Sequence, residues 1–209
     1  MRIDFWSDLV CPWCYVGKRR FERALAKAPN SGDVHVVHRS FQLNPAAQKG
    51  KTINRRDMLK SKYGWSEPQA EAMDARMAQT AAAEGLEYHL GADGVTGNTG
   101  DAHQLTHLAG QRGVQDAVVE RLFRAYFTER RSLFDSDSLI ELASKAGLDA
   151  DEVQRVLREG TYVDAVAADS REAKALGVNG VPFFVVDNRF GISGAQPSEV
   201  FLEALSIGR

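Results

Sequence analysis

The two cysteines of this 209-residue chain, Cys11 and Cys14, lie three positions apart with Pro12 and Trp13 between them. Proline suits the first position of a helix, because its fixed φ fits there and its missing N–H would have no partner anyway. Cys11 then stands at a helix N-terminus, where unpaired backbone N–H groups favour a thiolate, and Cys14 follows one turn later on the core-facing side. This asymmetry predicts thiol–disulfide exchange, in which Cys11 attacks a disulfide and Cys14 resolves the mixed disulfide.

Other uses of two neighbouring cysteines fit this chain less well. A structural zinc ion normally takes four ligands, and there is neither a second cysteine pair nor a histidine pair near them. Covalent haem attachment would require a histidine after the second cysteine, where Tyr15 stands. We therefore expect no metal and no tightly bound cofactor. Two unreactive core cysteines remain the alternative to a redox pair.

A second signal is the segment Gly180-Val181-Pro182-Phe183, in which a proline leads into a strongly apolar run. Proline cannot donate to a strand ladder, so Pro182 is expected at a strand start or in a special turn. Taken alone, this segment is compatible with an ordinary trans proline that begins a strand.

The elements that position these residues are predicted near the two ends of the chain. They are a strand at 2–6, a helix over 12–28 and a strand at 34–41, then a helix over 161–177, antiparallel strands at 183–186 and 189–192, and a final helix from 197. Together they form one small α/β domain, to which we assign residues 1–47 and 158–209.

The middle of the chain, assigned as residues 48–157, shows helix signals and no strand signals. Helices are expected over 66–85, 118–127 and 136–147 and from Asp149, with a glycine-rich loop at 91–100. The fold class is therefore α/β, with an all-helical domain inserted between the two halves of the first domain.

Composition limits the partners. The net charge is −2 with no run of like charges, which argues against a nucleic-acid binder. No apolar stretch approaches the roughly 18 residues of a membrane span, and the N-terminus lacks the features of a signal peptide. We expect a cytoplasmic protein, in which a structural disulfide would be unusual and paired cysteines would do chemistry.

Four segments, 4–22, 39–45, 98–105 and 177–196, resemble the thioredoxin superfamily and, within it, the DsbA-like oxidoreductases of the FrnE type. The resemblance implies a thioredoxin fold, Cys11 as nucleophile, Cys14 as resolving thiol and Pro182 as a cis proline. It also implies thiol–disulfide oxidoreductase or disulfide isomerase activity. A cis bond would turn the backbone of Val181 toward a bound substrate beside Cys11.

The resemblance extends to kappa-class glutathione transferases and 2-hydroxychromene-2-carboxylate isomerases, which have serine in place of Cys11. The alternative function is therefore a glutathione-dependent isomerase or transferase acting on a small aromatic substrate, with glutathione as co-substrate. A third hypothesis is a partner-binding module without redox turnover. A homodimer is compatible with the sequence.

The chain departs from the thioredoxin pattern at one position that bears on proton transfer. Thioredoxin and DsbA carry a buried acid six positions before the first cysteine, where this chain has Phe5. Either Asp4 or Asp8 serves by another route, or the acid relay is absent.

Several further residues are candidates for substrate binding. Pro12, Trp13 and Val181 flank the cysteines in the expected fold, and Asn44 follows the second strand, where either a substrate contact or a turn would explain it. His103 could donate to a glutathione or substrate carboxylate, or be a structural histidine. Asn98 could contact the substrate or cap the helix that carries His103.

Overall fold

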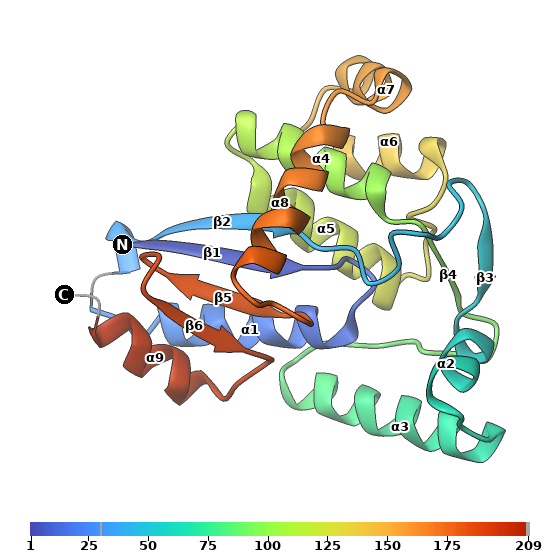
Figure 1. The fold of residues 1–209 in the computed structure, drawn as a ribbon, viewed down its shortest axis with the longest axis horizontal. Coiled ribbons are helices and arrows are strands. Elements are labelled where there is room, and N and C mark those ends of the chain that lie inside the picture. Colours follow the sequence, from blue (N-terminus) through green and yellow to red (C-terminus); the bar gives the residue numbers. More distant parts are fainter. Residues whose placement is uncertain (30, 208–209) are drawn as a thin grey trace.

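A four-stranded mixed sheet in the order β2-β1-β5-β6 forms the centre of the computed structural model, which describes residues 1–29 and 31–207 (Figure 1). Strand β1 (Arg2–Ser7) pairs in parallel with β2 (His35–Ser40) and antiparallel with β5 (Phe183–Val186). Strand β6 (Phe190–Ser193) completes the sheet, antiparallel to β5. Strands from both ends of the chain thus meet in one sheet, as expected for a single α/β domain.

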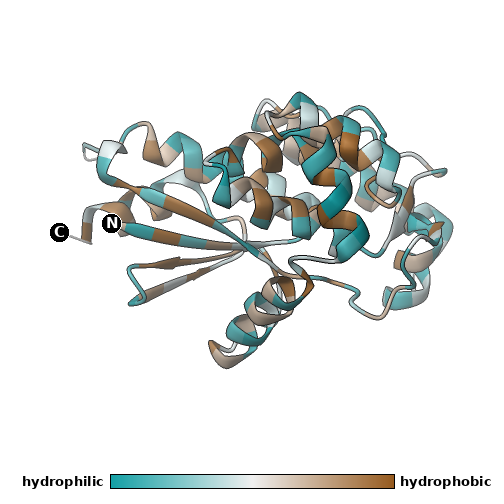
Figure 2. Cartoon of the chain, turned by 90° about the horizontal axis from the view of Figure 1, so that it is seen from above, coloured by the Kyte–Doolittle hydropathy of each residue, from teal (hydrophilic) through white to brown (hydrophobic). Residues whose placement is uncertain are grey.

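The side chains of successive residues in β1 point to opposite faces of this sheet. Phe5 stacks on Phe184 with ring centroids 4.2 Å apart, on the face covered by α1 (Pro12–Leu25) and α9 (Ser198–Ile207). Trp6 points to the other face, where its indole N–H donates to the carbonyl of Asp169 in α8 (Val163–Ala175) at 3.1 Å. Hydrophobic residues accordingly run along the strands between the flanking helices (Figure 2).

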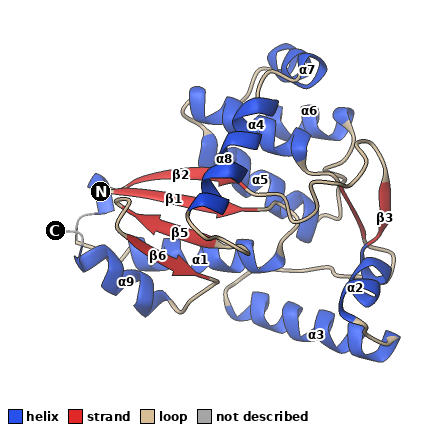
Figure 3. Cartoon of the chain, viewed as in Figure 1, coloured by secondary structure: helices blue, strands red, loops and turns tan. Residues whose placement is uncertain are grey.

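The inserted region is built mainly from helices, as predicted (Figure 3). They are α2 (Arg55–Tyr63), α3 (Glu67–Ala83), α4 (Gly100–Gln111), α5 (Gln115–Phe127), α6 (Ser136–Lys145) and α7 (Ala150–Glu159). Ser66 and Gln69 form a capping box at the start of α3, and the Asp149 side chain accepts from the Glu152 N–H at 2.9 Å at the start of α7. Within the described part of the chain, none of the helices is both long and apolar enough to cross a lipid bilayer.

One expectation for this region was wrong, because it contains two short strands. Strand β3 (Thr52–Asn54) pairs antiparallel with β4 (Val95–Gly97), so part of the expected loop at 91–100 is extended and paired. Three residues are too few for a period-2 pattern to be visible in the sequence. The pair fixes the start of α2, because the Asn54 side chain accepts from the Asp57 N–H at 2.9 Å.

Helix α1 lies between the sheet and the insertion and contacts both. It ends at Leu25, earlier than expected, and a 3₁₀ turn (Ser31–Asp33) precedes β2. Tyr15 of α1 stacks on Phe123 of α5 at 5.0 Å, and its hydroxyl donates to Glu120 at 2.6 Å. One hydrophobic core runs from the sheet through α1 into α4–α7. The insertion therefore packs directly against the helix that carries the cysteines.

Candidate active site

The two cysteines occupy the N-terminus of α1, as predicted. Cys11 is the N-cap residue, and its backbone N–H donates to the carbonyl of Asp8 at 2.9 Å, while the Cys14 N–H donates to the carbonyl of Cys11 at 3.0 Å. Both are free thiols, and the two cysteines approach to 3.3 Å. Cys11 is 5% exposed and Cys14 is 0% exposed, so an incoming substrate can reach only Cys11.

Burial distinguishes the second thiol chemically. Burial, together with the adjacent Cys11, raises the pKa of the Cys14 thiol well above its usual value, and a hydrogen bond from the Asp8 backbone N–H opposes this only in part. Cys14 is therefore a protonated thiol near neutral pH. It must give up that proton before it can attack another sulfur.

The segment around Pro182 lies against the cysteines. The Val181–Pro182 peptide bond is cis, as the resemblance implied. The Cys11 thiol donates to the Val181 carbonyl with an Sγ–O distance of 3.5 Å. Gly17 of α1 makes room for the proline, because a Cβ atom there would lie only 3.0 Å from Pro182 Cγ.

Tyr88 contacts the cysteine segment and was not identified from the sequence. Its hydroxyl donates to the Pro12 carbonyl at 2.7 Å, and its ring stacks on Phe127 at 4.6 Å. Burial, with smaller effects from Cys11 and Cys14, raises the pKa of Tyr88 far above its usual value, so the hydroxyl stays a donor. No periodic pattern or motif surrounds this residue in the sequence, so no signal in the sequence pointed to it.

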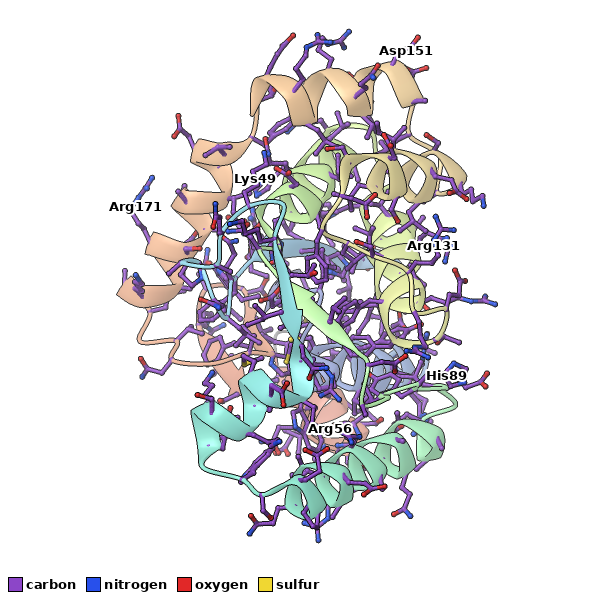
Figure 4. All side chains as sticks on the ribbon, turned by 90° about the vertical axis from the view of Figure 1, so that its right-hand side faces the viewer. Lys49, Arg56, His89, Arg131, Asp151 and Arg171 are labelled. Carbon is purple, nitrogen blue, oxygen red and sulfur yellow. The ribbon has the colours of Figure 1, made fainter. Side chains whose placement is uncertain are left out.

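A cleft of about 900 Å³ opens beside Cys11, between the start of α1 and helices α2 and α3. Four predicted substrate-binding residues line it: Pro12, Trp13, Asn44 and Val181. Most of the remaining lining is apolar and includes Leu43, Ile53, Met58, Tyr63, Met73 and Met77. In Figure 4, β3 and β4 lie side by side, and the labelled Arg56 lies between α2 and α3.

The cleft offers few positive groups to an anionic ligand. Arg55 lines it, but this side chain is buried and its Nη2 donates to Asp74 at 2.7 Å. Lys62 is the other cation on the lining, with its ammonium 5.5 Å from the Tyr63 ring centroid. Asp8 and Asp74 supply an equal number of negative groups. An apolar ligand with little net charge matches this lining.

Two other predicted substrate-binding residues lie outside the cleft lining. Asn98 holds the start of α4, because its Oδ1 accepts from the Gly100 N–H at 2.8 Å while its amide donates to the Ala47 carbonyl at 2.7 Å. His103 is 2% exposed, and its Nε2 lies 3.4 Å from Asp8 Oδ1. The Asn98 side chain is thus engaged within the protein, and the His103 side chain is buried.

Asp4 and Asp8, the two acids considered for proton transfer, have different surroundings in the structure. Burial alone would raise the pKa of Asp4, but hydrogen bonds from Arg2 and Arg39 lower it below its usual value. Asp4 is thus held in ion pairs. Asp8 instead contacts both Cys11 and Cys14 through its backbone and lines the cleft. Elsewhere in residues 1–29 and 31–207, no three histidine, cysteine or acidic side chains are grouped as a metal site would require.

Comparisons with known proteins agree with this geometry. A model of the DSBA-like thioredoxin domain matches residues 2–206. The crystal structure of a probable DsbA oxidoreductase from Streptomyces coelicolor is 50% identical and superposes with a TM-score of 0.95, covering 100% of this chain and 89% of that one.

Two solved structures share the fold at lower identity. The cytosolic disulfide reductase DsbM from Pseudomonas aeruginosa, solved with glutathione, has a TM-score of 0.67 at 18% identity, over 99% of this chain and 98% of that one. A 2-hydroxychromene-2-carboxylate isomerase has a TM-score of 0.68 at 17% identity, over 100% and 95%. Because the family model extends over nearly the whole sequence and the relative from Streptomyces coelicolor matches it from end to end, the chain belongs to the DSBA-like thioredoxin domain family.

Proposed function

We propose that this protein is a thiol–disulfide oxidoreductase that uses Cys11 as nucleophile and Cys14 as resolving thiol. The observation that carries the proposal is the contact of two free thiols, approaching to 3.3 Å, beside the Val181 carbonyl. The more accessible sulfur stands at the helix N-terminus and the fully buried one behind it. This order suits attack followed by resolution.

The reaction has two exchange steps. The Cys11 thiolate attacks one sulfur of the substrate disulfide, a Cys11–substrate disulfide forms, and the first substrate thiolate leaves and takes up a proton. Cys14 then loses its proton and attacks Cys11 Sγ, which forms the Cys11–Cys14 disulfide and releases the second substrate thiolate. The substrate gains two electrons and the protein loses two; a separate thiol such as glutathione, acting as co-substrate, returns them.

The surroundings of Cys11 support a substrate with an extended backbone and apolar side chains. Val181 offers main-chain groups at the sulfur, while Trp13 is 45% exposed at the mouth of the cleft and Asn44 lies on its rim. In a reducing cytoplasm the pair would be mostly reduced, so we propose net reduction or isomerisation of disulfides there.

A glutathione-dependent isomerase or transferase is the second candidate. The cleft volume and the shared fold favour it. The lining weakens it, because glutathione carries two carboxylates and Arg55 is already paired with Asp74. The presence of both cysteines, rather than a serine at position 11, also favours the dithiol mechanism.

The test is equilibration of the protein with glutathione buffers, followed by acid quenching, alkylation of free thiols and mass spectrometry. We expect one two-electron transition to an internal disulfide, at a potential between about −270 and −180 mV. Cys14→Ser should stop at a glutathione adduct on Cys11, and Cys11→Ser should remove disulfide turnover. A wild-type protein that forms only the adduct, or a Cys11→Ser variant with full glutathione-dependent turnover, would support the second candidate.

A further inference from the structure

Methionine side chains gather on the wall of the cleft beside Cys11. The chain has four methionines, and three of them line this cleft: Met58, Met73 and Met77. Met58 comes from α2, whereas Met73 and Met77 come from α3 and lie about one helical turn apart. A cleft with a mostly apolar lining thus contains most of the thioether groups of the protein.

Ion pairs between the two helices hold this wall together. Asp74 follows Met73 in the chain and is buried. Its carboxylate accepts from Arg55 Nη2 at 2.7 Å and from Arg56 Nη2 at 3.2 Å. Because both arginines belong to α2, these bonds fix α3 against α2, and the two helices lie next to each other (Figure 1). Met73 is thereby kept on the cleft lining.

The three methionines differ in how easily a dissolved oxidant reaches them. Met73 is 38% exposed and Met77 is 7% exposed, and the exposure of Met58 lies between these values. A thioether is oxidised to a sulfoxide by an oxidant that contacts its sulfur. Met73 should therefore react before the other two.

Oxidation would change what this part of the wall can bind. Methionine is unbranched and flexible, so it adapts its shape to varied apolar groups. Its sulfoxide is polar and carries an oxygen that accepts hydrogen bonds. An apolar substrate group packed on that oxygen would leave it without a donor, which costs free energy. The wall at Met73 would then bind such a group less tightly.

We propose that Met73 is an oxidation site through which hydrogen peroxide weakens the binding of apolar disulfide substrates in the cleft. This inference rests on the proposed function. The Met73 sulfur attacks one peroxide oxygen, and an S–O bond forms as the O–O bond breaks. The proton on the attacked oxygen passes to the departing oxygen, which leaves as water. The sulfur loses two electrons and the peroxide gains them.

This modification differs from oxidation of the dithiol in how it is reversed. Peroxide also converts the two thiols to a disulfide, with two waters as the other product. A thiol reductant opens the Cys11–Cys14 disulfide again, whereas the sulfoxide requires a methionine sulfoxide reductase. After exposure to peroxide, the enzyme would therefore recover its activity on small polar disulfides before its activity on apolar ones.

The test oxidises Met73 while the cysteines are protected. The protein is converted to the Cys11–Cys14 disulfide with oxidised glutathione, treated with hydrogen peroxide, reduced with dithiothreitol and freed of reductant. Peptide mass spectrometry should find the sulfoxide at Met73 well before Met77. At low substrate concentration, a peptide disulfide with apolar flanking residues should then be reduced about fivefold more slowly or worse. Bis(2-hydroxyethyl) disulfide should react as before.

Two substitutions show whether Met73 carries the effect, and each variant is compared with itself before peroxide treatment. Met73→Leu keeps an apolar side chain of similar size but has no thioether, so treatment should not change its rate with the apolar peptide. Met58→Leu is the matched control. It removes a thioether from the same lining and leaves Met73 in place, so treatment should slow it as much as the wild type.

The outcomes separate this inference from the function on which it rests. An untreated wild type that reduces neither disulfide would refute the proposed function and, with it, the role of Met73. If the untreated protein reduces both and the Met73 sulfoxide changes neither rate, only the role of Met73 is wrong.

Three other results would also overturn the proposal: equal slowing with both substrates, slowing that persists in Met73→Leu, or a sulfoxide that forms at Met77 as early as at Met73. Slowing that is confined to the apolar peptide and reversed by methionine sulfoxide reductases would support it.

Discussion

The Tyr88 hydroxyl donates to the carbonyl of Pro12 across 76 positions of sequence, at 2.7 Å. This bond connects the inserted region to the turn between the two cysteines. Tyr88→Phe should lower the free energy of unfolding by about 1 kcal/mol, because the bond is lost while the ring packing stays. It should also shift the dithiol–disulfide equilibrium, since the bond fixes the turn that both sulfurs flank.

The control for this change is Thr128→Val. The Thr128 hydroxyl donates to the carbonyl of Glu87, the residue before Tyr88, at 2.7 Å and touches neither cysteine. Denaturant unfolding and titration with glutathione buffers measure both effects. A Tyr88→Phe variant with an unchanged redox equilibrium would show that the bond contributes stability alone.

Alkylation should distinguish the two thiols. Because Cys14 is fully buried and burial raises its pKa, iodoacetamide at neutral pH should add one carbamidomethyl group to the native reduced protein, at Cys11. The second group should appear only after denaturant is added. Peptide mass spectrometry locates the adducts, and rapid labelling of both sites in the native state would contradict the assigned roles.

Gly17 controls how closely α1 approaches Pro182. Gly17→Ala gains about 0.5–1 kcal/mol of helix propensity, but its Cβ would lie 3.0 Å from Pro182 Cγ. We expect little net change in stability and a slower attack by Cys11, because Val181 and Pro182 must shift away from the sulfur. Gly110→Ala in α4 meets only the end of the Gln115 side chain, so it should leave the attack rate unchanged. The attack rate of Cys11 in each variant is measured by stopped flow, as the rate at which the first thiol is released from a substrate disulfide.

The ion pair between the buried Lys18 and Glu120 should make the free energy of unfolding depend on pH in the acid range. It is 2% exposed and pairs with Glu120 at 2.9 Å, and although burial alone would raise the pKa of Glu120, the nearby Lys18 charge lowers it. A carboxylate with a lowered folded-state pKa stabilises the fold above its ordinary value of 4.5, and this stabilisation is lost as the pH falls below it.

Glu120→Gln should therefore be less stable than the wild type at pH near 7. The difference should shrink as the pH is lowered from 4.5 toward about 3, because the unfolded chain takes up a proton at Glu120 before the folded protein does. Urea unfolding at the two pH values measures this. Lys18→Met, which leaves partly buried carboxylates without their cation, should be destabilised by more than about 1 kcal/mol. A constant difference between Glu120→Gln and wild type across this range would contradict the assigned coupling.

Ile53 tests whether the cleft binds apolar groups of the substrate. It is 52% exposed on the lining, so Ile53→Lys should fold normally and slow the reduction of a peptide disulfide with apolar flanking residues several-fold, while a small polar disulfide reacts as before. Val163→Lys provides an equally exposed control at 54%, on α8 and off the lining. Reduction of the apolar peptide at the wild-type rate would show that it does not use the cleft.

The sequence predicted the elements around Cys11 and Pro182 well, because these rest on strong local rules. A proline fixes the helix start, an apolar run marks β5, and the turn at Asp187 and Asn188 has φ angles of 49° and 55°, as its residue types suggest. The helix caps at Ser66 and Asp149 were likewise predicted from a few neighbouring residues.

Residues whose roles depend on contacts between distant segments were harder to predict. His103 stood out as a candidate, yet its neighbour Asp8 lies 95 positions away and no spacing rule connects them. Tyr88 and the β3–β4 pair depend in the same way on how the insertion packs. The insertion thus supplies groups to the site that only tertiary structure reveals.

Strand β1 lies between β2, which is made shortly after it, and β5, which is made much later. A growing chain emerges with its N-terminus first, so both thiols appear well before Val181, which follows Cys11 by 170 positions. Until then the sheet lacks β5, and neither the Val181 carbonyl nor Pro182 lies beside the two sulfurs. The surroundings proposed for the dithiol therefore form only after Val181 and Pro182 have been added to the chain.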